Sequence, residues 1–134
     1  MHAVDTNVVV RLLGGQRRVG DDAAQSKRAA SLFRTESILI STSVALETEW
    51  VLRSLYRFER TRIVHNLRKL AGLENVEFEN PLAITSALRW CEEGLDFADA
   101  LHLASSEGAD TFATFDAQMK RTAPRGSSPP IRLL

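Results

Sequence analysis

The sequence is poor in several features that define whole classes of protein. Cys91 is the single cysteine among 134 residues, so no internal disulfide can form and no cysteine cluster can bind zinc. No stretch approaches the roughly 20 apolar residues of a membrane-spanning helix, and Arg11 interrupts the apolar run near the start. An acid, Asp5, stands where a signal peptide needs a basic start. We therefore expect a cytoplasmic protein without membrane association, in which Cys91 is a buried apolar residue.

The chain also lacks net charge, because seventeen Lys and Arg residues balance seventeen Asp and Glu residues. Taken alone, this balance argues against binding nucleic acid through bulk charge. However, residues 53–69 hold six basic residues and one acid, whereas residues 74–116 hold ten acids and one base. The zero net charge is thus the sum over basic and acidic regions whose charges cancel. The basic stretch Arg53 to Lys69 is either a surface that contacts phosphate groups or a solvated helix face.

The apolar pattern predicts short strands that alternate with helices. We expect strands at residues 2–4, 37–41, 76–79, 111–114 and, at an edge, 131–134. Helices are expected at 8–13, around 22–33 after an Asp21 or Asp22 cap, at 44–56 after Ser43, at 59–71, at 81–91 after Asn80, and at 95–106 with Asp96 as cap. Residues 123–130, rich in Pro, Gly and Ser, read as an open loop. This order predicts one α/β domain, residues 1–134, with a mostly parallel sheet of four to five strands covered by helices on both faces.

Four acids occupy matching positions near the predicted strands. Asp5 follows the first strand, Asp116 follows the fourth, and Glu47 lies shortly after the second. Asp99 begins the helix before the fourth strand, in an apolar stretch where a solvated acid is not expected. Because ligands of open α/β sheets bind beyond the carboxyl ends of the strands, we expect the four carboxylates to meet at one edge.

Carboxylates held together repel one another, so such a cluster needs protons or a cation. Mg²⁺ and Mn²⁺ prefer oxygen ligands, and they lower the pKa of a bound water, which is the chemistry of phosphodiester hydrolysis. The four acids therefore favour a metal-dependent phosphodiesterase.

Each acid also has a purely structural interpretation. Asp5 and Asp96 have the spacing of helix caps, and Asp116 is a plausible turn residue. Glu49 is expected to be solvated surface, since it points away from the face that carries Glu47.

His102, three residues after Asp99, is open to two interpretations. It is either a partner that supports the acid or a partly buried helix residue.

Four segments of the chain resemble the motifs of a known family. Val4–Asn7, Leu46–Leu52, Asp96–Ala100 and Thr114–Asp116 resemble the four acidic motifs of PIN-domain ribonucleases, especially the VapC-type toxins of prokaryotic toxin–antitoxin pairs. The resemblance implies a three-layer α/β/α sandwich and a Mg²⁺- or Mn²⁺-dependent endoribonuclease. The site residues that it implies are Asp5, Glu47, Asp99 and Asp116 for catalysis, with Asp5, Asp99 and Asp116 on the metal and Thr6, Asn7 and Thr114 in support.

The resemblance also implies partners. It predicts a homodimer and a VapB-like antitoxin whose C-terminal segment occupies the active-site groove, with promoter DNA bound only through the antitoxin. The arginine-rich stretch after Trp50 is specific to this chain and has no counterpart in the resemblance.

Two other functions remain open. One is a non-catalytic PIN-fold module that binds nucleic acid or regulates a partner. The other is phosphoryl transfer with Asp5 as nucleophile, although such phosphatases need a second acid where this chain has Asn7.

Overall fold

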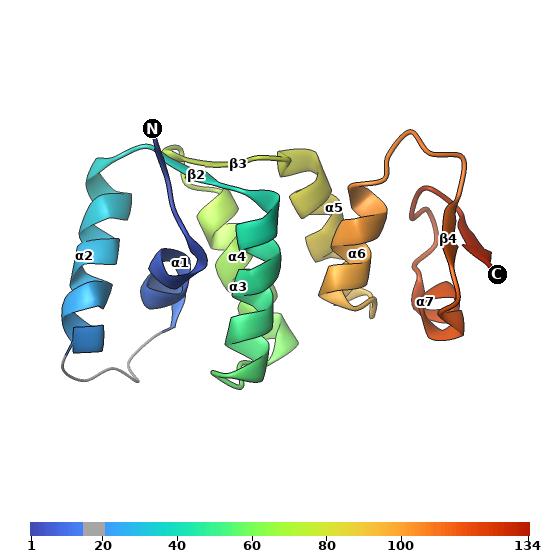
Figure 1. Ribbon diagram of the computed structural model, residues 1–134, viewed down its shortest axis with the longest axis horizontal. Coiled ribbons are helices and arrows are strands. Elements are labelled where there is room, and N and C mark those ends of the chain that lie inside the picture. The colour runs from blue at the N-terminus through green and yellow to red at the C-terminus, as the bar shows by residue number, and fades with distance from the viewer. Residues whose placement is uncertain (15–20) are drawn as a thin grey trace. The chain divides into compact units, whose positions relative to one another are not determined.

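The computed structural model describes residues 1–14 and 21–134, with the backbone alone at Asp21 and Asp22. Strands alternate with helices along the chain, as the sequence predicts (Figure 1). The elements in order are β1 (His2–Ala3), α1 (Thr6–Leu13), α2 (Asp21–Thr35), β2 (Ile38–Ile40), α3 (Thr42–Ser54), α4 (Arg60–Ala71), β3 (Val76–Phe78), α5 (Pro81–Glu92), α6 (Phe97–Ala104), β4 (Phe112–Thr114), α7 (Ala117–Thr122) and β5 (Ile131–Leu133). They form two compact units, residues 1–79 (unit 1) and residues 80–134 (unit 2).

A parallel three-stranded sheet organises unit 1. The strand order is β1-β2-β3, with His2 opposite Ile38 and Ile38 opposite Val76. Ile38 and Ile40 are buried, and β3 buries Val76 and Phe78 while Glu77 is exposed. This alternation is the pattern from which the third strand is predicted.

The helices of unit 1 pack on one another and on this sheet. Helix α1 contacts α2 and α3, α3 contacts α4, and α4 contacts β3. Apolar side chains of these helices, among them Val9, Leu52 and Leu67, are at most 2% exposed. Helix α1 ends at Gly14, as predicted, and the Gly14 N–H donates to the Val10 carbonyl at 2.8 Å. The predicted cap of α2 by Asp21 or Asp22 lies outside the described side chains.

The predicted start of α3 is wrong by two residues. The cap is Ser41, whose Oγ accepts a hydrogen bond from the Val44 N–H at 3.3 Å, and not Ser43. Because β2 ends at Ile40, Ser41 is the residue that still has extended backbone, with φ −69° and ψ 158°. Ser43 lies within the first turn instead.

Unit 2 contains a parallel pair of strands and three helices. Strand β4 pairs with β5, with Phe112 opposite Ile131, and α7 packs against β5. Helices α5 and α6 pack together, and Cys91 is buried, as predicted. Asn80 caps α5 through a hydrogen bond from the Ala83 N–H at 3.1 Å, with Pro81 in the first turn, which confirms both predictions. Gly94 follows this helix with a φ of 115°, a conformation that glycine adopts readily.

One helix of unit 2 has no counterpart in the sequence prediction. Helix α7 is six residues long and begins directly after Asp116, which the sequence places only in a turn or a site. None of the described helices is both long and apolar enough to cross a membrane.

Asn75 joins the end of α2 to the sheet. Its side-chain Nδ2 donates to the backbone carbonyls of Phe33 at 2.7 Å and Glu36 at 2.6 Å. The backbone carbonyl of Asn75 accepts a hydrogen bond from the Ile38 N–H. We expect Asn75→Ala to lower the free energy of unfolding by about 1–2 kcal/mol, since it removes two hydrogen bonds. Urea denaturation measures this change.

Asn66→Ala is the matched control, because Asn66 is also half-buried but lies within helix α4. It should change the free energy of unfolding by less than about 0.5 kcal/mol. Equal losses in the two variants would contradict the role given to Asn75.

Candidate active site

Asp5 lies in unit 1 at the junction of β1 and α1. Its Oδ1 accepts a hydrogen bond from the Val8 N–H at 3.1 Å, and the side chain is exposed. Asp5 is therefore a helix cap, as one interpretation of the sequence holds, but the cap uses one carboxylate oxygen. Oδ2 lies outside this hydrogen bond, so the cap fixes the carboxylate in place without consuming both of its oxygens.

Glu47 lies in the same unit, on the exposed face of α3. Helix α3 packs against α1, the helix that Asp5 caps. The next residue, Thr48, is fully buried, and its Oγ1 has no hydrogen-bond partner among the described residues. Glu47 therefore stands on the side of α3 that is turned away from the core.

The prediction that Glu49 is solvated is wrong. Its side chain is buried, and both carboxylate oxygens accept hydrogen bonds from the Arg53 Nε, at 3.3 and 3.0 Å. The Arg53 Nη2 also donates to Glu49 Oε1 at 3.3 Å. Because Arg53 lies one helical turn further along α3, it neutralises a carboxylate that burial alone would destabilise. Arg53 is thus committed to an internal ion pair.

Asp99 lies in unit 2, half-buried in the first turn of α6. Burial raises its pKa above the ordinary value, and the carboxylates of Asp96 and Asp116 raise it further, while His102 opposes the shift. Asp96 caps α6 by accepting the Asp99 N–H at 3.2 Å, so its predicted role as a cap is confirmed. Because His102 is exposed, its reading as a partly buried helix residue is wrong.

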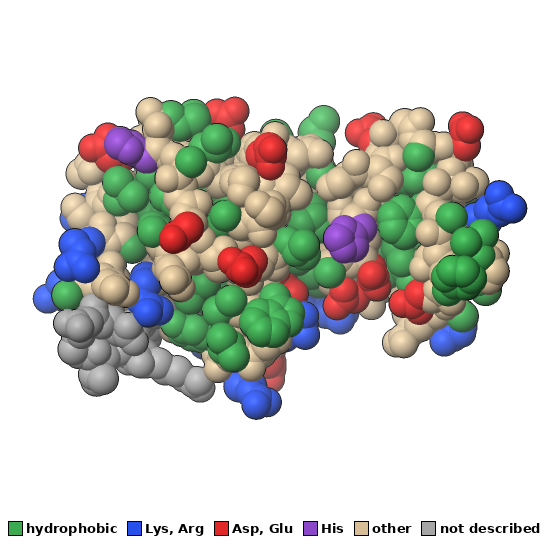
Figure 2. All heavy atoms as spheres, viewed as in Figure 1, with side chains coloured by type: hydrophobic (Ala, Val, Ile, Leu, Met, Phe, Trp, Pro, Cys, Tyr) green, Lys and Arg blue, Asp and Glu red, His purple; other side chains and the backbone are tan. Residues whose placement is uncertain are grey.

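Asp116 lies between β4 and α7. Its Oδ1 accepts hydrogen bonds from the N–H groups of Gln118 at 2.9 Å and Met119 at 3.1 Å. Its own N–H donates to Thr114 Oγ1 at 3.0 Å. These contacts nucleate the short helix α7 and hold the Asp116 carboxylate near that of Asp99. Figure 2 shows acidic side chains gathered on one face of unit 2, next to a histidine.

The four acids thus form one pair in each unit. Asp99 and Asp116 interact electrostatically within unit 2, and Asp5 and Glu47 lie on packed elements of unit 1. Convergence of all four at one edge stays a prediction. In residues 1–14 and 21–134, no three His, Cys, Asp or Glu side chains are already clustered as a metal site. The donor set nevertheless fits Mg²⁺ or Mn²⁺, because these ions prefer carboxylate oxygens and would offset the neighbouring carboxylates that, after burial, raise the pKa of Asp99.

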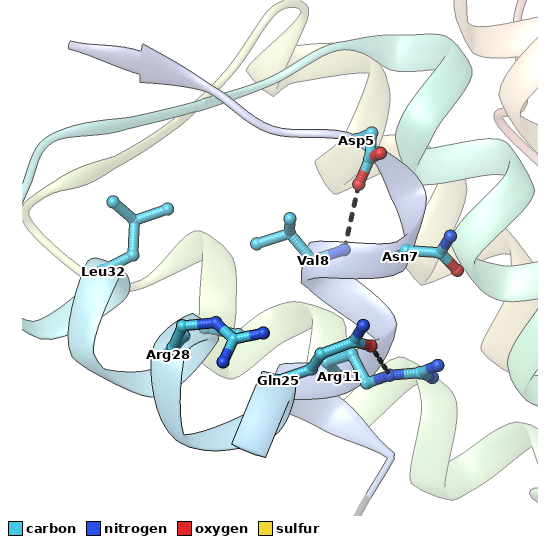
Figure 3. A pocket seen from close by; sticks show the side chains of 8 residues that line it. Asp5, Asn7, Val8, Arg11, Gln25, Arg28 and Leu32 are labelled. Atoms are coloured by element: carbon cyan, nitrogen blue, oxygen red, sulfur yellow. Dashed lines mark hydrogen bonds between the residues drawn. The ribbon is translucent and has the colours of Figure 1, made fainter. Parts of the chain in front are cut away.

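A pocket of about 460 Å³ adjoins Asp5 in unit 1 (Figure 3). Its lining comes from α1 and α2 and from the residue before α1: Asp5, Asn7, Val8, Arg11, Gln25, Arg28, Ala29 and Leu32. The Arg11 Nε donates to Gln25 Oε1 at 2.9 Å, and its Nη1 donates to the Tyr56 hydroxyl at 3.2 Å. No pattern in the sequence predicted this pocket. The available signal was Arg11 itself, a charge within the apolar run Val8–Leu13.

The raised pKa of Asp99 has a consequence for stability. The fold favours the protonated carboxyl, so its contribution is fully present below the ordinary pKa and is lost as pH rises through the raised pKa. We therefore expect Asp99→Asn, measured in EDTA, to raise the free energy of unfolding near neutral pH and to have less effect in acid. Urea denaturation across this pH range measures the difference.

The control is Asp110→Asn, which changes an exposed acid of the same unit. A gain for Asp110→Asn as large as that for Asp99→Asn would contradict the assignment.

In a carboxyl NMR titration, Asp116→Asn should move the pKa of Asp99 towards its ordinary value.

The comparisons with known proteins identify the family of the chain. The family model of the PIN domain matches residues 3–124, a range that includes Asp5, Glu47, Asp99 and Asp116. No curated protein and no solved structure matches the chain. PIN domains are generally nucleases and typically use divalent metal ions.

The match also accounts for the architecture. The described helices and parallel strands constitute an α/β, PIN-like fold, as the sequence predicts. The chain belongs to the PIN-domain family.

Proposed function

We propose that the chain is a Mg²⁺- or Mn²⁺-dependent endoribonuclease, the VapC-type toxin of a toxin–antitoxin pair. The observation that carries this proposal is the place of Asp99 in the first turn of α6, where burial and the nearby carboxylates of Asp96 and Asp116 raise its pKa, with Asp116 held at the start of α7. Acids whose pKa is raised by burial and by neighbouring carboxylates are typical of functional sites, and PIN domains typically use divalent metal ions.

In this proposal residues 1–134 act as a single PIN domain with one site. Asp5 and Glu47 from unit 1 join Asp99 and Asp116 from unit 2. The PIN family model matches residues 3–124, which belong to both units, and this supports a single domain.

Asp5, Asp99 and Asp116 would hold the divalent ion. A bound Mg²⁺ or Mn²⁺ ion would stabilise the negative charge that develops on the phosphate oxygens during hydrolysis. The N-terminal caps keep Asp5 and Asp116 in fixed conformations, so these two carboxylates lose little side-chain entropy when they bind a ligand. Thr114 supports Asp116 because its hydroxyl oxygen accepts a hydrogen bond from the Asp116 N–H, and Thr6 and Asn7 are the proposed supports beside Asp5.

Glu47 is the proposed base. It is exposed on α3, and it accepts a proton from the attacking water, directly or through a second water. The water oxygen adds to phosphorus, and the bond from phosphorus to the leaving ribose oxygen breaks. Burial of Glu49 against Arg53 leaves Glu47 as the acid of α3 that is available for this role.

The proposed biological partners are those of a VapC-type toxin. They are an RNA substrate, a second copy of the chain, and a VapB-like antitoxin through which promoter DNA is bound. The non-catalytic alternative is not favoured, since all four acids are present in a family that consists generally of nucleases.

The basic stretch Arg53 to Lys69 contributes less charge to RNA binding than its composition suggests. Arg53 pairs with Glu49, and the Arg62 guanidinium lies 3.7 Å from the centre of the Phe58 ring. Both side chains are engaged within unit 1. The exposed face of α4 remains a proposed phosphate-contacting surface, with Lys69 at its end.

The proposal is tested by replacing one acid in each unit. We expect Asp5→Asn and Asp99→Asn each to lower cleavage of total RNA with Mg²⁺ present by about a hundredfold or more, because each removes a charged ligand. Gel analysis of timed digests measures the rate, and circular dichroism checks the fold.

The matched control is again Asp110→Asn, which should cleave as fast as the parent chain. If Asp5→Asn or Asp99→Asn also cleaves at the parental rate, the assignment of the site is wrong. A parent chain that binds Mn²⁺ but cuts no RNA would instead favour the non-catalytic module.

A further inference from the structure

We propose that the pocket between α1 and α2 binds one nucleotide of single-stranded RNA, with its phosphate on Arg28 and Arg11. The inference rests on the proposed function for the nature of the substrate, but its geometry lies wholly within unit 1. The volume of about 460 Å³ falls within the range of pockets that enclose small-molecule ligands.

Among the described residues that line the pocket, two guanidinium groups stand against one carboxylate, a charge of +1 for this part of the lining. Arg28 is exposed on α2, and Figure 3 shows its guanidinium extending towards α1. Arg11 is held in place by Gln25 on α2 and by Tyr56. A fixed planar guanidinium loses little side-chain entropy on binding and matches the geometry of phosphate oxygens. The pocket therefore has a preformed anion site on one side.

The other side of the pocket is apolar. Ala29 is buried, and Val8 and Leu32 are half-buried, all three within the lining. Figure 3 shows the Val8 side chain directed towards Leu32. A ribose or a base face can cover this surface while the phosphate stays on the arginines. The pocket thus offers both of the surfaces that one nucleotide needs.

Amide side chains favour a nucleotide over an acidic peptide. Asn7 and Gln25 line the pocket, and the Gln25 Oε1 already accepts from Arg11, which leaves its Nε2 as a donor. Base edges present both donors and acceptors, which amides match, whereas the side chains of an acidic peptide need donors alone. Because Asp5 lines the same pocket, the bound nucleotide lies beside the proposed cleavage site. The pocket is therefore placed to select the base next to the cleaved bond.

The experiment measures binding without cleavage. Fluorescence anisotropy follows a short fluorescein-labelled single-stranded RNA bound to the full chain in EDTA, over a series of salt concentrations. We expect Arg28→Gln to weaken binding about tenfold, as loss of a charge-assisted hydrogen bond does. The slope of log K against log salt should fall by about 0.7, the value for one phosphate contact on a single strand. Arg28→Lys keeps the positive charge but loses the two parallel N–H donors of the guanidinium, so it should bind RNA with intermediate affinity.

Lys27→Gln is the matched control, because Lys27 is the exposed neighbour of Arg28 on α2 and does not line the pocket. Equal affinities and equal salt slopes for Arg28→Gln and Lys27→Gln would overturn the inference. The inference is also overturned if Arg28→Gln leaves RNA binding unchanged and instead weakens the binding of an acidic peptide.

The two proposals fail separately. A parent chain that binds RNA through Arg28 but cuts none contradicts the proposed function and leaves the pocket assigned. A parent chain that cuts RNA while Arg28→Gln binds it normally contradicts the pocket alone.

Discussion

The partly buried position of Asp99 beside two other carboxylates is the constraint on which the candidate site depends. Asp99 is half-buried near Asp96 and Asp116, and all three influences raise its pKa. The arrangement costs stability when the acid is ionised, and a divalent cation bound there, as the proposed function requires, would offset that charge. Helix starts make the cluster possible, because backbone N–H groups hold Asp96 and Asp116 in place.

The same device recurs in unit 1, where a strand leads directly into a capped helix. Asp5 follows β1 and caps α1, and Asp116 follows β4 and caps α7. In each case one carboxylate oxygen accepts hydrogen bonds from N–H groups that the helix start leaves without a backbone partner, and in the proposed function the same carboxylate would also bind the cation. The structural and functional interpretations of these acids are compatible, and the cap is what positions the charge.

Local signals in the sequence predicted most of the elements and the cap at Asn80. These signals are the periodicity of apolar residues, turn residues and capping residues, and each depends on only a few neighbouring positions. Features that depend on contacts across elements were missed. Helix α7 is too short for periodicity and depends on the cap at Asp116. Glu49 is buried because α3 turns that face to the core, although Arg53 four residues later was a readable signal. The pocket of Arg11 and Arg28 exists only once α1 packs on α2.

A double-mutant cycle on Mn²⁺ affinity tests most directly whether the acids of both units form one metal site. The parent chain, Asp5→Asn, Asp99→Asn and the double variant are compared by electron paramagnetic resonance titration. If one ion is bound by acids of both units, each single variant loses most of the affinity and the double variant loses little more, so the two effects are strongly coupled. Independent, additive losses, or a loss confined to one of the two single variants, would contradict a shared site.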